Sequence, residues 1–569
     1  MRKIFFILVT LFVAGLSYAQ NNTFAHKVRV GETLYGISQS YGVSVADVKK
    51  VNAGMTDNIM VGQVINIPQS ATGETHHTIQ AGETLYSISK KYNVTSKVIT
   101  DANPGLSASN FRTGTIIVIP RGSYATAAQQ SSDVAAPKER KDYKTIHEVK
   151  KKETIYSISK QYGITQQDLV KANPELKDGK LKKGAHLNIP YPVSERYVLP
   201  TDNEVFKTLS DQKSSTRYEA VNVAVILPFG LDAGGKTAEA RKMADFYKGF
   251  LLAVDSLKDA GRNVNVYAYD EGSSVYSILS QAEMKNMHLI VGPARADHVE
   301  AVAQYAHDNN ILNVIPMSTK ENAVNNHKTS FQVNSPLNYT YSFVYEKFLQ
   351  LYPGANIIFA AMSDKADNEE FVWGFKKYLT MKDISYERVS IQNMDNIMSL
   401  LKKGKKNIVI PSAGTSRSFE VLVSELDNRN VLDTYDVSLF GFPDWQVFTD
   451  KNERSLDKYK CAFFTTFFSD ASSYRVSAFG NHFKQWFKKP QLASCPKFGE
   501  LGYDIGAYFL RGLCDYGAAF CENTDKVSYT SLQNPFCFVR RNNWSGFENS
   551  VVMFVFYKGN DVIEIKRYE

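Results

Sequence analysis

Residues 31–52 read GETLYGISQSYGVSVADVKKVN, and two further stretches of the chain follow the same pattern. These stretches read GETLYSISKKYNVTSKVITDAN from Gly82 and KETIYSISKQYGITQQDLVKAN from Lys152. Each copy is followed by a short β-branched run that ends at a proline: Pro68, Pro120 and Pro190. Agreement in both letters and spacing indicates an internal threefold repeat.

One copy can be interpreted as a small packed unit. A strand is expected over residues 26–30, and Thr33 is a suitable N-cap for a helix after it. In that helix, apolar residues recur at the spacing of one buried face: Leu34, Ile37 and Tyr41. Ser44 predicts the start of a second helix, and the β-branched run at 64–67 predicts a closing strand. The repeat therefore predicts a strand–helix–helix–strand module.

The three copies, residues 26–68, 77–120 and 146–190, resemble the LysM family of carbohydrate-binding modules. The resemblance implies binding of glycans that contain N-acetylglucosamine, such as peptidoglycan, in a groove between the loop after the first strand and the loop before the second. It implies these glycan-binding residues: Gly31, Glu32, Thr33, Leu34, Asn52, Gly82, Glu83, Thr84, Leu85 and Asn103. In the third copy Lys152 replaces the glycine and Ile155 the leucine, so a packing spacer is the alternative to a third binding site.

The loop residues suit an acetamido sugar. Glycine lets the backbone approach closely, free N–H groups match the carbonyl, and a leucine floor matches the methyl group. Several weak grooves on one chain gain avidity on a repeating polymer when flexible segments let them bind together. The Ala/Ser/Gln-rich stretch 121–142 is expected to be one such linker, and residues 191–218 a second.

From about residue 221 the sequence alternates between expected strands and expected helices. Buried-type runs such as VNVAVILPF (221–229), HLIVG (288–292) and ILNVIP (311–316) are separated by amphipathic segments, among them 275–285. A second series begins near residue 338 and closes with VVMFVFYKGNDVIEI, a predicted hairpin with a Gly-Asn turn. The pattern predicts two parallel α/β halves in series.

This region, about 221–569, resembles the type 1 periplasmic binding proteins, which close two lobes around a small solute. The resemblance rests on ILPF, FYKGFLLAVDSLKDAGRNVNVYAYDEG, IVGPARADHVEAVAQYAHDNNILNVIPMST and GELGYDIGAYFLRGL. Together, the two resemblances imply an α/β and α+β multidomain chain. Three small βααβ LysM modules are followed by a two-lobed parallel α/β clamshell.

The second resemblance also implies a solute cleft between the lobes, with these candidate residues: Ser318, Thr319, Ser412, Asp444 and Trp445. Two departures disfavour an α-amino acid as the solute. Ala296 stands where a serine is usual, and residues 412–416 lack the carboxylate that usually follows the KNIVIPS strand. For Trp445, packing in the hinge is the alternative to lining the cleft.

The segment GLDAGGKT, residues 230–237, matches the pattern of a phosphate-binding loop, and Asp270 ends a later strand as a magnesium-binding acid would. The next helix opens with the charged letters AEARK, and the clamshell resemblance implies an irregular loop over the cleft here. We therefore expect no nucleotide, and no cofactor or metal ion. Neither HExxH nor GxSxG occurs, so no enzyme activity is expected.

The chain has 569 residues and a formal net charge of +8. Residues 21–200 hold 23 Lys and Arg against 15 Asp and Glu, without a clustered basic stripe, so nucleic acid is not an expected partner. Residues 1–19 are interpreted as a signal peptide cleaved after Ala19, which predicts a periplasmic or cell-envelope protein. No later apolar run is long enough for a membrane span. The five cysteines lie in the last fifth and are expected to be mostly buried thiols.

These observations predict a non-enzymatic envelope protein that binds peptidoglycan glycan strands through LysM modules and a small solute through the clamshell. The alternative is a scaffold or regulator whose degenerate clamshell docks onto a cell-wall enzyme, either a peptidoglycan synthase or a hydrolase. A third class, a wall hydrolase, would need convergent carboxylates in the cleft, and the sequence shows no such group.

Overall fold

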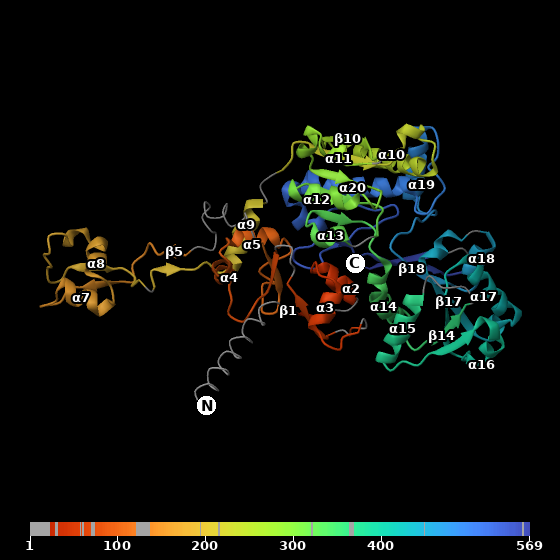
Figure 1. Ribbon diagram of the computed structural model, residues 1–569, viewed down its shortest axis with the longest axis horizontal. Coiled ribbons are helices and arrows are strands. Elements are labelled where there is room, and N and C mark those ends of the chain that lie inside the picture. Colours follow the sequence, from red (N-terminus) through yellow and green to blue (C-terminus); the bar gives the residue numbers. More distant parts are fainter. Residues whose placement is uncertain are drawn as a thin grey trace, which may run out of the picture. The chain divides into compact units, whose positions relative to one another are not determined.

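The computed structural model describes residues 23–568, apart from short gaps, and the expected signal peptide lies outside the described residues (Figure 1). The gaps are 29–31, 57–58, 60–61, 70–73, 121–136, 194, 214–216, 273, 320–321, 363–368, 449 and 560–562. The chain forms two compact units. One comprises residues up to 70 together with 216–569, and the other comprises residues 71–215.

Each repeat folds as the predicted strand–helix–helix–strand module, and its two strands pair antiparallel. The first copy comprises β1 (Thr23–Lys27), α2 (Leu34–Ser40), α3 (Val45–Val51) and β2 (Val64–Pro68). The second comprises β3 (Glu74–Thr78), α4 (Leu85–Tyr92), α5 (Ser96–Ala102) and β4 (Ile116–Pro120). The third comprises β6 (Thr145–Glu148), α7 (Ile155–Tyr162), α8 (Gln166–Ala172) and β7 (His186–Ile189). Thr33 and Ser44 cap α2 and α3 as predicted, whereas β1 begins three residues earlier than expected.

The stretch 191–218, expected to be a linker, contains regular structure. Strand β8 (Tyr197–Val198) pairs antiparallel with β5 (Lys138–Glu139), and α9 (Asp202–Lys213) follows it. A reciprocal capping box starts α9, because the Thr201 backbone N–H donates to Glu204 and the Glu204 N–H donates to the Thr201 hydroxyl. The expectation of a linker was wrong here because α9 buries Val205 and Leu209 against the second module.

The first lobe of the C-terminal region is built on a seven-stranded sheet, in the order β10-β9-β11-β12-β13-β20-β19. Its strands are β9 (Val221–Leu227), β10 (Val264–Asp270), β11 (Leu289–Val291), β12 (Leu312–Ile315), β13 (Ser330–Gln332), β19 (Phe538–Val539) and β20 (Phe547–Asn549). Its helices are α10 (Ala238–Asp259), α11 (Tyr276–Leu279), α12 (Val299–Asp308), α13 (Asn322–Asn326), α19 (Tyr474–Phe487) and α20 (Phe498–Tyr516). The helix expected over 275–285 is therefore only the short α11, followed by a 3₁₀ turn.

The second lobe repeats this plan in the order β15-β14-β16-β17-β18-β21-β22. Its strands are β14 (Asn356–Ala361), β15 (Glu387–Ser390), β16 (Lys406–Pro411), β17 (Asp436–Gly441), β18 (Ala462–Thr465), β21 (Val552–Tyr557) and β22 (Ile563–Tyr568). Its helices are α14 (Tyr341–Leu351), α15 (Glu369–Met381), α16 (Ile397–Leu400), α17 (Ser416–Asn428) and α18 (Asp450–Lys458). Both lobes place their first five strands parallel in the order second, first, third, fourth, fifth. This order confirms the predicted resemblance to the type 1 periplasmic binding protein fold.

The sequence predicts parallel sheets in both lobes, but the C-terminal strands of each lobe form antiparallel pairs. Strand β21 pairs antiparallel with both β18 and β22, which confirms the predicted closing hairpin. In the first lobe β19 pairs antiparallel with β20. Both sheets are therefore mixed, with a parallel body and an antiparallel edge.

The first LysM module packs against the first lobe within one compact unit. The indole N–H of Trp544, between β19 and β20, donates to the carbonyl of Ser40 at 3.4 Å, and its ring lies 5.6 Å from that of Tyr41. Helix α13 contacts α2 (Figure 1). In α2, Gly36 is buried, whereas the equivalent Ser87 of the second module is exposed. This position is therefore covered in the first module and accessible in the second.

Within the described part of the chain, no helix is both long and apolar enough to cross a membrane. All five cysteines are free thiols. Cys461 and Cys514 are buried, Cys521 and Cys537 are partly buried, and Cys495 is exposed. The expectation of mostly buried thiols therefore holds for two of them fully and for two in part.

Candidate functional site

The third LysM module carries an open groove with a volume of about 520 Å³. It lies between the start of α7, one face of α8 and the loop that follows α8. Its lining residues are Ile155, Gln166, Gln167, Val170, Lys171, Leu176, Lys177 and Gly179. This is the position that the LysM resemblance predicts for a glycan groove, in the copy whose function the sequence left open.

The groove combines an apolar floor with a polar rim. Ile155, Val170 and Leu176 are buried or partly buried, whereas Gln166 and Lys177 are exposed. Side-chain amides and ammonium groups can donate to the carbonyl and hydroxyl oxygens of a sugar, and the floor can accept a methyl group. The arrangement therefore suits a polar ligand with small apolar substituents.

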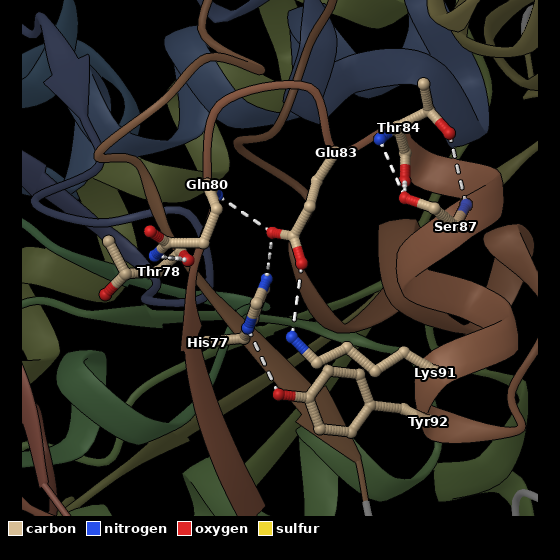
Figure 2. A network of polar contacts seen from close by, with 8 residues as sticks. All are labelled: His77, Thr78, Gln80, Glu83, Thr84, Ser87, Lys91 and Tyr92. Carbon is tan, nitrogen blue, oxygen red and sulfur yellow. Dashed lines mark hydrogen bonds and ion pairs between the residues drawn. The ribbon is translucent and has the colours of Figure 1, made fainter. Parts of the chain in front are cut away.

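A buried His–Glu–Tyr cluster holds the first loop of each module, as Figure 2 shows for the second. His77 Nε2 lies 2.7 Å from Glu83 Oε2, and Tyr92 Oη lies 3.1 Å from His77 Nδ1. The same carboxylate accepts the backbone N–H of Gln80 at 2.8 Å and pairs with Lys91 at 3.1 Å. Glu83 thus ties the loop to β3 and α4 at once.

The other two modules repeat this cluster with nearly the same distances. The histidine Nε2 lies 2.8 Å from the glutamate Oε2 in both, and the histidine Nδ1 contacts the tyrosine hydroxyl at 2.8 or 3.0 Å. The residues are His26, Glu32 and Tyr41, and His147, Glu153 and Tyr162. Glu32 and Glu83, predicted to contact glycan, therefore have carboxylates bound within the module, where they shape the loop.

The cluster shifts the titration of its members in the second module. Burial would raise the pKa of Glu83, but hydrogen bonds from the Gln80 N–H, His77 and Lys91 outweigh it and lower the pKa to about 2. Burial also lowers the pKa of His77, against the opposing effect of Glu83. The neutral imidazole and the ionised carboxylate are thus the favoured forms.

The predicted asparagine contacts have a structural role. Asn103 is fully buried, donates to the carbonyls of Ile99 and Val118 at 2.7 Å, and accepts the Val118 N–H at 2.8 Å. Asn52 makes the same contacts with Val48 and Asn66. Each side chain fastens the end of the second helix to the closing strand. Asn103 is therefore wrong as a glycan contact, and the amide of Asn52 is engaged in the same way.

The remaining predicted loop residues divide into caps and floor. Thr33 and Thr84 accept backbone N–H groups as N-caps, and Gly82 has φ of 83°, while Gly31 lies outside the described residues. Leu34 and Leu85 are 2% and 0% exposed. In the second module, the Leu85 N–H donates to Asp202 and Leu85 packs against α9, so this loop is covered.

The first lobe binds a carboxylate of its own where a solute was expected. Glu271, directly after β10, accepts the backbone N–H groups of Ala294 and Arg295 and contacts His298 Nδ1 at 2.8 Å. Its side chain is fully buried, and burial raises its pKa against the effect of these hydrogen bonds. The loop after β11, in which Ala296 replaces the usual serine, thus has two of its backbone N–H groups bound by Glu271. Of the nearby hydroxyl pair, Ser318 is buried and Thr319 exposed.

In the second lobe the three candidates have different surroundings. Ser412 Oγ accepts the Met362 N–H at 2.8 Å. Asp444 is exposed, and burial together with the Glu370 and Asp444 carboxylates raises the pKa of Tyr341 to about 12. Trp445 is 0% exposed and packs on Phe419 in the core of this lobe. The prediction that Trp445 lines a cleft is therefore wrong.

The segment 230–237 is also anchored by an internal carboxylate. Asp270 accepts the backbone N–H of Gly230 at 3.2 Å and that of Leu231 at 2.7 Å. A phosphate group bound by this loop would need these same N–H groups as hydrogen-bond donors. The acid that resembled a magnesium ligand instead ties the loop to β10.

Two signals in the sequence could have identified the features that were missed. A histidine precedes the loop glutamate by six residues in all three copies, which predicts the repeated cluster. A leucine stands two residues after Asn-Pro in the second and third copies, at Leu106 and Leu176. Leu176 belongs to the floor of the groove in the third module.

The LysM domain family matches residues 26–68, 77–120 and 147–190. N-acetylmuramoyl-L-alanine amidase sle1 of Staphylococcus epidermidis is 29% identical over 165 residues, which cover 28% of this chain and 48% of that protein. Cell wall-binding protein YocH of Bacillus subtilis is 32% identical over 111 residues, or 19% of this chain and 39% of that protein. The chain thus spans half or less of the length of these relatives.

Among solved structures, a putative branched-chain amino acid ABC transporter protein from Rhodospirillum rubrum aligns with a TM-score of 0.44 and 11% identity. It covers 61% of this chain and 100% of that chain. An ABC transporter substrate-binding protein from Desulfitobacterium hafniense in complex with Leu aligns with the same coverage, a TM-score of 0.37 and 12% identity. The chain thus contains three LysM domains, which imply peptidoglycan binding and a place in the cell envelope, followed by a two-lobed region with a type 1 periplasmic binding protein-like fold.

Proposed function

We propose that this chain is a non-enzymatic cell-envelope protein that binds the N-acetylglucosamine-containing glycan of peptidoglycan, with the third LysM domain as its accessible site. One observation carries the proposal: the groove of about 520 Å³ opens at the position expected for glycan. The signal peptide expected in residues 1–19 would deliver the protein to the periplasm. The similarity of part of this chain to a cell wall-binding protein supports the proposal.

The groove offers the contacts that an acetamido sugar needs. Ile155 and Leu176 provide an apolar floor for the methyl group, and Gln166 and Gln167 provide amides for the carbonyl and hydroxyl oxygens. Lys171 and Lys177 add positive charge, which suits a wall polymer with carboxylates. A single shallow groove of this kind predicts weak binding to one short glycan and stronger binding to the polymer.

The test is binding of the full chain to purified peptidoglycan and to N-acetylglucosamine tetramers. Ile155→Asp places a charge on the floor, and an acid at the start of α7 is compatible with the helix. We expect binding to weaken about tenfold or more. Tyr156→Asp is the matched control, because Tyr156 is 60% exposed and lies outside the groove. Equal binding by wild type and Ile155→Asp would contradict the proposed site.

For the clamshell we favour a scaffold or regulator that docks onto a peptidoglycan synthase or hydrolase, with a small-solute receptor as the second candidate. The observation behind this order is Glu271, which takes the N–H groups that would hold a solute carboxylate. A thermal-shift screen of the full chain with amino acids, sugars and muropeptides separates the two candidates. A stabilising solute whose effect is lost in Thr319→Val would favour the receptor.

A further inference from the structure

Helix α9 covers the residues of the second LysM module that correspond to the groove of the third module. Sequence alignment of the repeats makes Leu85 and Leu106 equivalent to Ile155 and Leu176, which line the open groove of the third module. In the second module these leucines form one apolar cluster with Val205 and Leu209 of α9. Val205 is 1% exposed and Leu209 is 8% exposed, so both apolar side chains of α9 are buried.

Polar and aromatic contacts fix α9 in this position. Asp202 Oδ1 accepts the backbone N–H of Leu85 at 3.0 Å, at the start of α4. The ring of Phe206 lies 6.0 Å from that of Phe111, which lies in the loop before β4. The helix therefore spans both walls of the groove, and Figure 1 shows α9 beside α4 and α5.

We propose that α9 is a built-in competitor that keeps the second LysM groove closed to glycan until the helix is displaced. The inference rests on the proposed function, since it concerns which of the LysM grooves is available. An oxygen of Asp202 already accepts the Leu85 N–H, so an acetamido carbonyl cannot accept it at the same time. Val205 and Leu209 likewise fill the space over the floor.

The energetic consequence is a reduced apparent affinity. A glycan must bind the fraction of molecules in which α9 has left, and the apparent dissociation constant rises by the reciprocal of that fraction. The helix is tethered close to the groove, because it directly follows the β5–β8 ribbon in the same compact unit. Tethering keeps its effective concentration high and makes closure the resting state. Long glycan strands that also engage the third module would favour displacement.

The test uses the full chain with Ile155→Asp present, so that binding at the third module is suppressed. Val205→Asn combined with Leu209→Asn removes the apolar face of α9. We expect binding of N-acetylglucosamine tetramers and of purified peptidoglycan to increase at least tenfold over the Ile155→Asp chain. Lys207→Asn combined with Thr208→Asn, on the exposed face of the same helix, is the matched control and should leave binding unchanged.

The opened variant is the chain that carries Ile155→Asp, Val205→Asn and Leu209→Asn. A second measurement tests whether this variant is still folded. A synthetic peptide of residues 199–213 should bind the opened chain and return glycan binding to the low level. Hydrogen exchange at the Leu85 N–H should be slow in wild type and fast in the opened variant. Peptide binding without a gain in glycan binding would overturn the competitor, and so would slow exchange at Leu85 after both substitutions.

The outcomes also separate this inference from the proposed function. If wild type binds glycan and loses it with Ile155→Asp, the proposed function stands whatever α9 does. If wild type and the opened variant both fail to bind glycan, the proposed function fails, and the competitor role of α9 fails with it. If only the opened variant binds, the competitor is supported and the third module is not the accessible site.

Discussion

Glu271 Oε1 and His298 Nδ1 lie 2.8 Å apart at the carboxyl edge of the first lobe's sheet. The same carboxylate accepts the N–H groups of Ala294 and Arg295. In an open α/β sheet this edge is where ligands bind. The first lobe therefore holds an internal carboxylate where a receptor would bind its solute, and this carboxylate accepts the N–H groups of Ala294 and Arg295 in the loop before α12.

This relationship predicts chemical rescue. Glu271→Ala removes the acceptor of two partly buried backbone N–H groups and the carboxylate beside His298, which costs roughly 2–4 kcal/mol of unfolding free energy. Added acetate should enter the vacated space and raise the melting temperature of the variant, whereas sodium chloride at equal ionic strength should not. Asp297→Ala is the control, because its side chain is 63% exposed and it should behave as wild type. If acetate stabilises the control as much as Glu271→Ala, Glu271 has no such role.

The second LysM module should lose stability as pH falls. The pKa of His77 is lowered by burial, so the folded state binds fewer protons than the unfolded state below about pH 6.5. The pKa of Glu83 is lowered to about 2, so the same loss continues between about pH 4.5 and 2. Both shifts make protonation favour the unfolded module.

The measurement is hydrogen exchange of residues 74–93, corrected for the intrinsic effect of pH. Glu83→Gln should lower protection at neutral pH and abolish the further loss between pH 4.5 and 2. Lys97→Gln is the control, because Lys97 pairs with Asp101 at 2.5 Å on the module surface and is not a member of the cluster. An unchanged acid profile in Glu83→Gln would refute the role of the cluster.

Trp544→Ala should release the first LysM module from the first lobe. Trp544 is 8% exposed and contacts Ser40 and Tyr41, so its removal should cost about 3 kcal/mol. Exchange should then rise together in α2 and α13 while the strands of the first lobe stay protected. Trp486→Ala removes a tryptophan that is 53% exposed and should change neither helix. Release of α13 without α2 would mean that the two do not dock as one interface.

The sequence predicts local features well and contacts distant along the chain poorly. The threefold repeat, the N-caps at Thr33 and Ser44 and the alternation of the two lobes follow from spacing and from local hydrogen bonds. The site is harder to predict, because equivalent loops differ between modules: the loop is open at Ile155 in the third module and covered at Leu85 in the second. What differs is α9, more than 100 residues further along the chain, and no property of the loop itself reveals it.

For the two asparagines, the sequence suggested a contact with a ligand where the structure shows a contact that holds the fold together. Asn52 and Asn103 recur at one position, which resembles a conserved contact with a ligand, yet each recurs because one side chain must satisfy three backbone groups. Glu271 is a similar case, because a single acid after a strand carries no signal for the loop it will bind. Repetition therefore identifies a constraint without saying whether fold or function imposes it.

Close packing of two helices in the first lobe gives the last prediction. Gly249 of α10 faces Gly499 of α20, and Gly502 faces Phe246. A Cβ built at Gly502 would overlap the Phe246 carbonyl, so the two backbones are in contact there. Since backbone cannot yield as a flexible side chain does, Gly502→Ala should force the helices apart and cost about 3 kcal/mol or more.

The matched control lies in the neighbouring helix α19. A Cβ at Gly480 would meet no atom within 4 Å, so Gly480→Ala should raise the unfolding free energy by about 1 kcal/mol through helix propensity alone. Denaturant unfolding, followed by the tryptophan fluorescence of the lobes, measures both changes in unfolding free energy. The opposite signs expected for the same substitution depend only on what each Cβ would touch. If both variants were stabilised, α10 and α20 would not pack backbone to backbone.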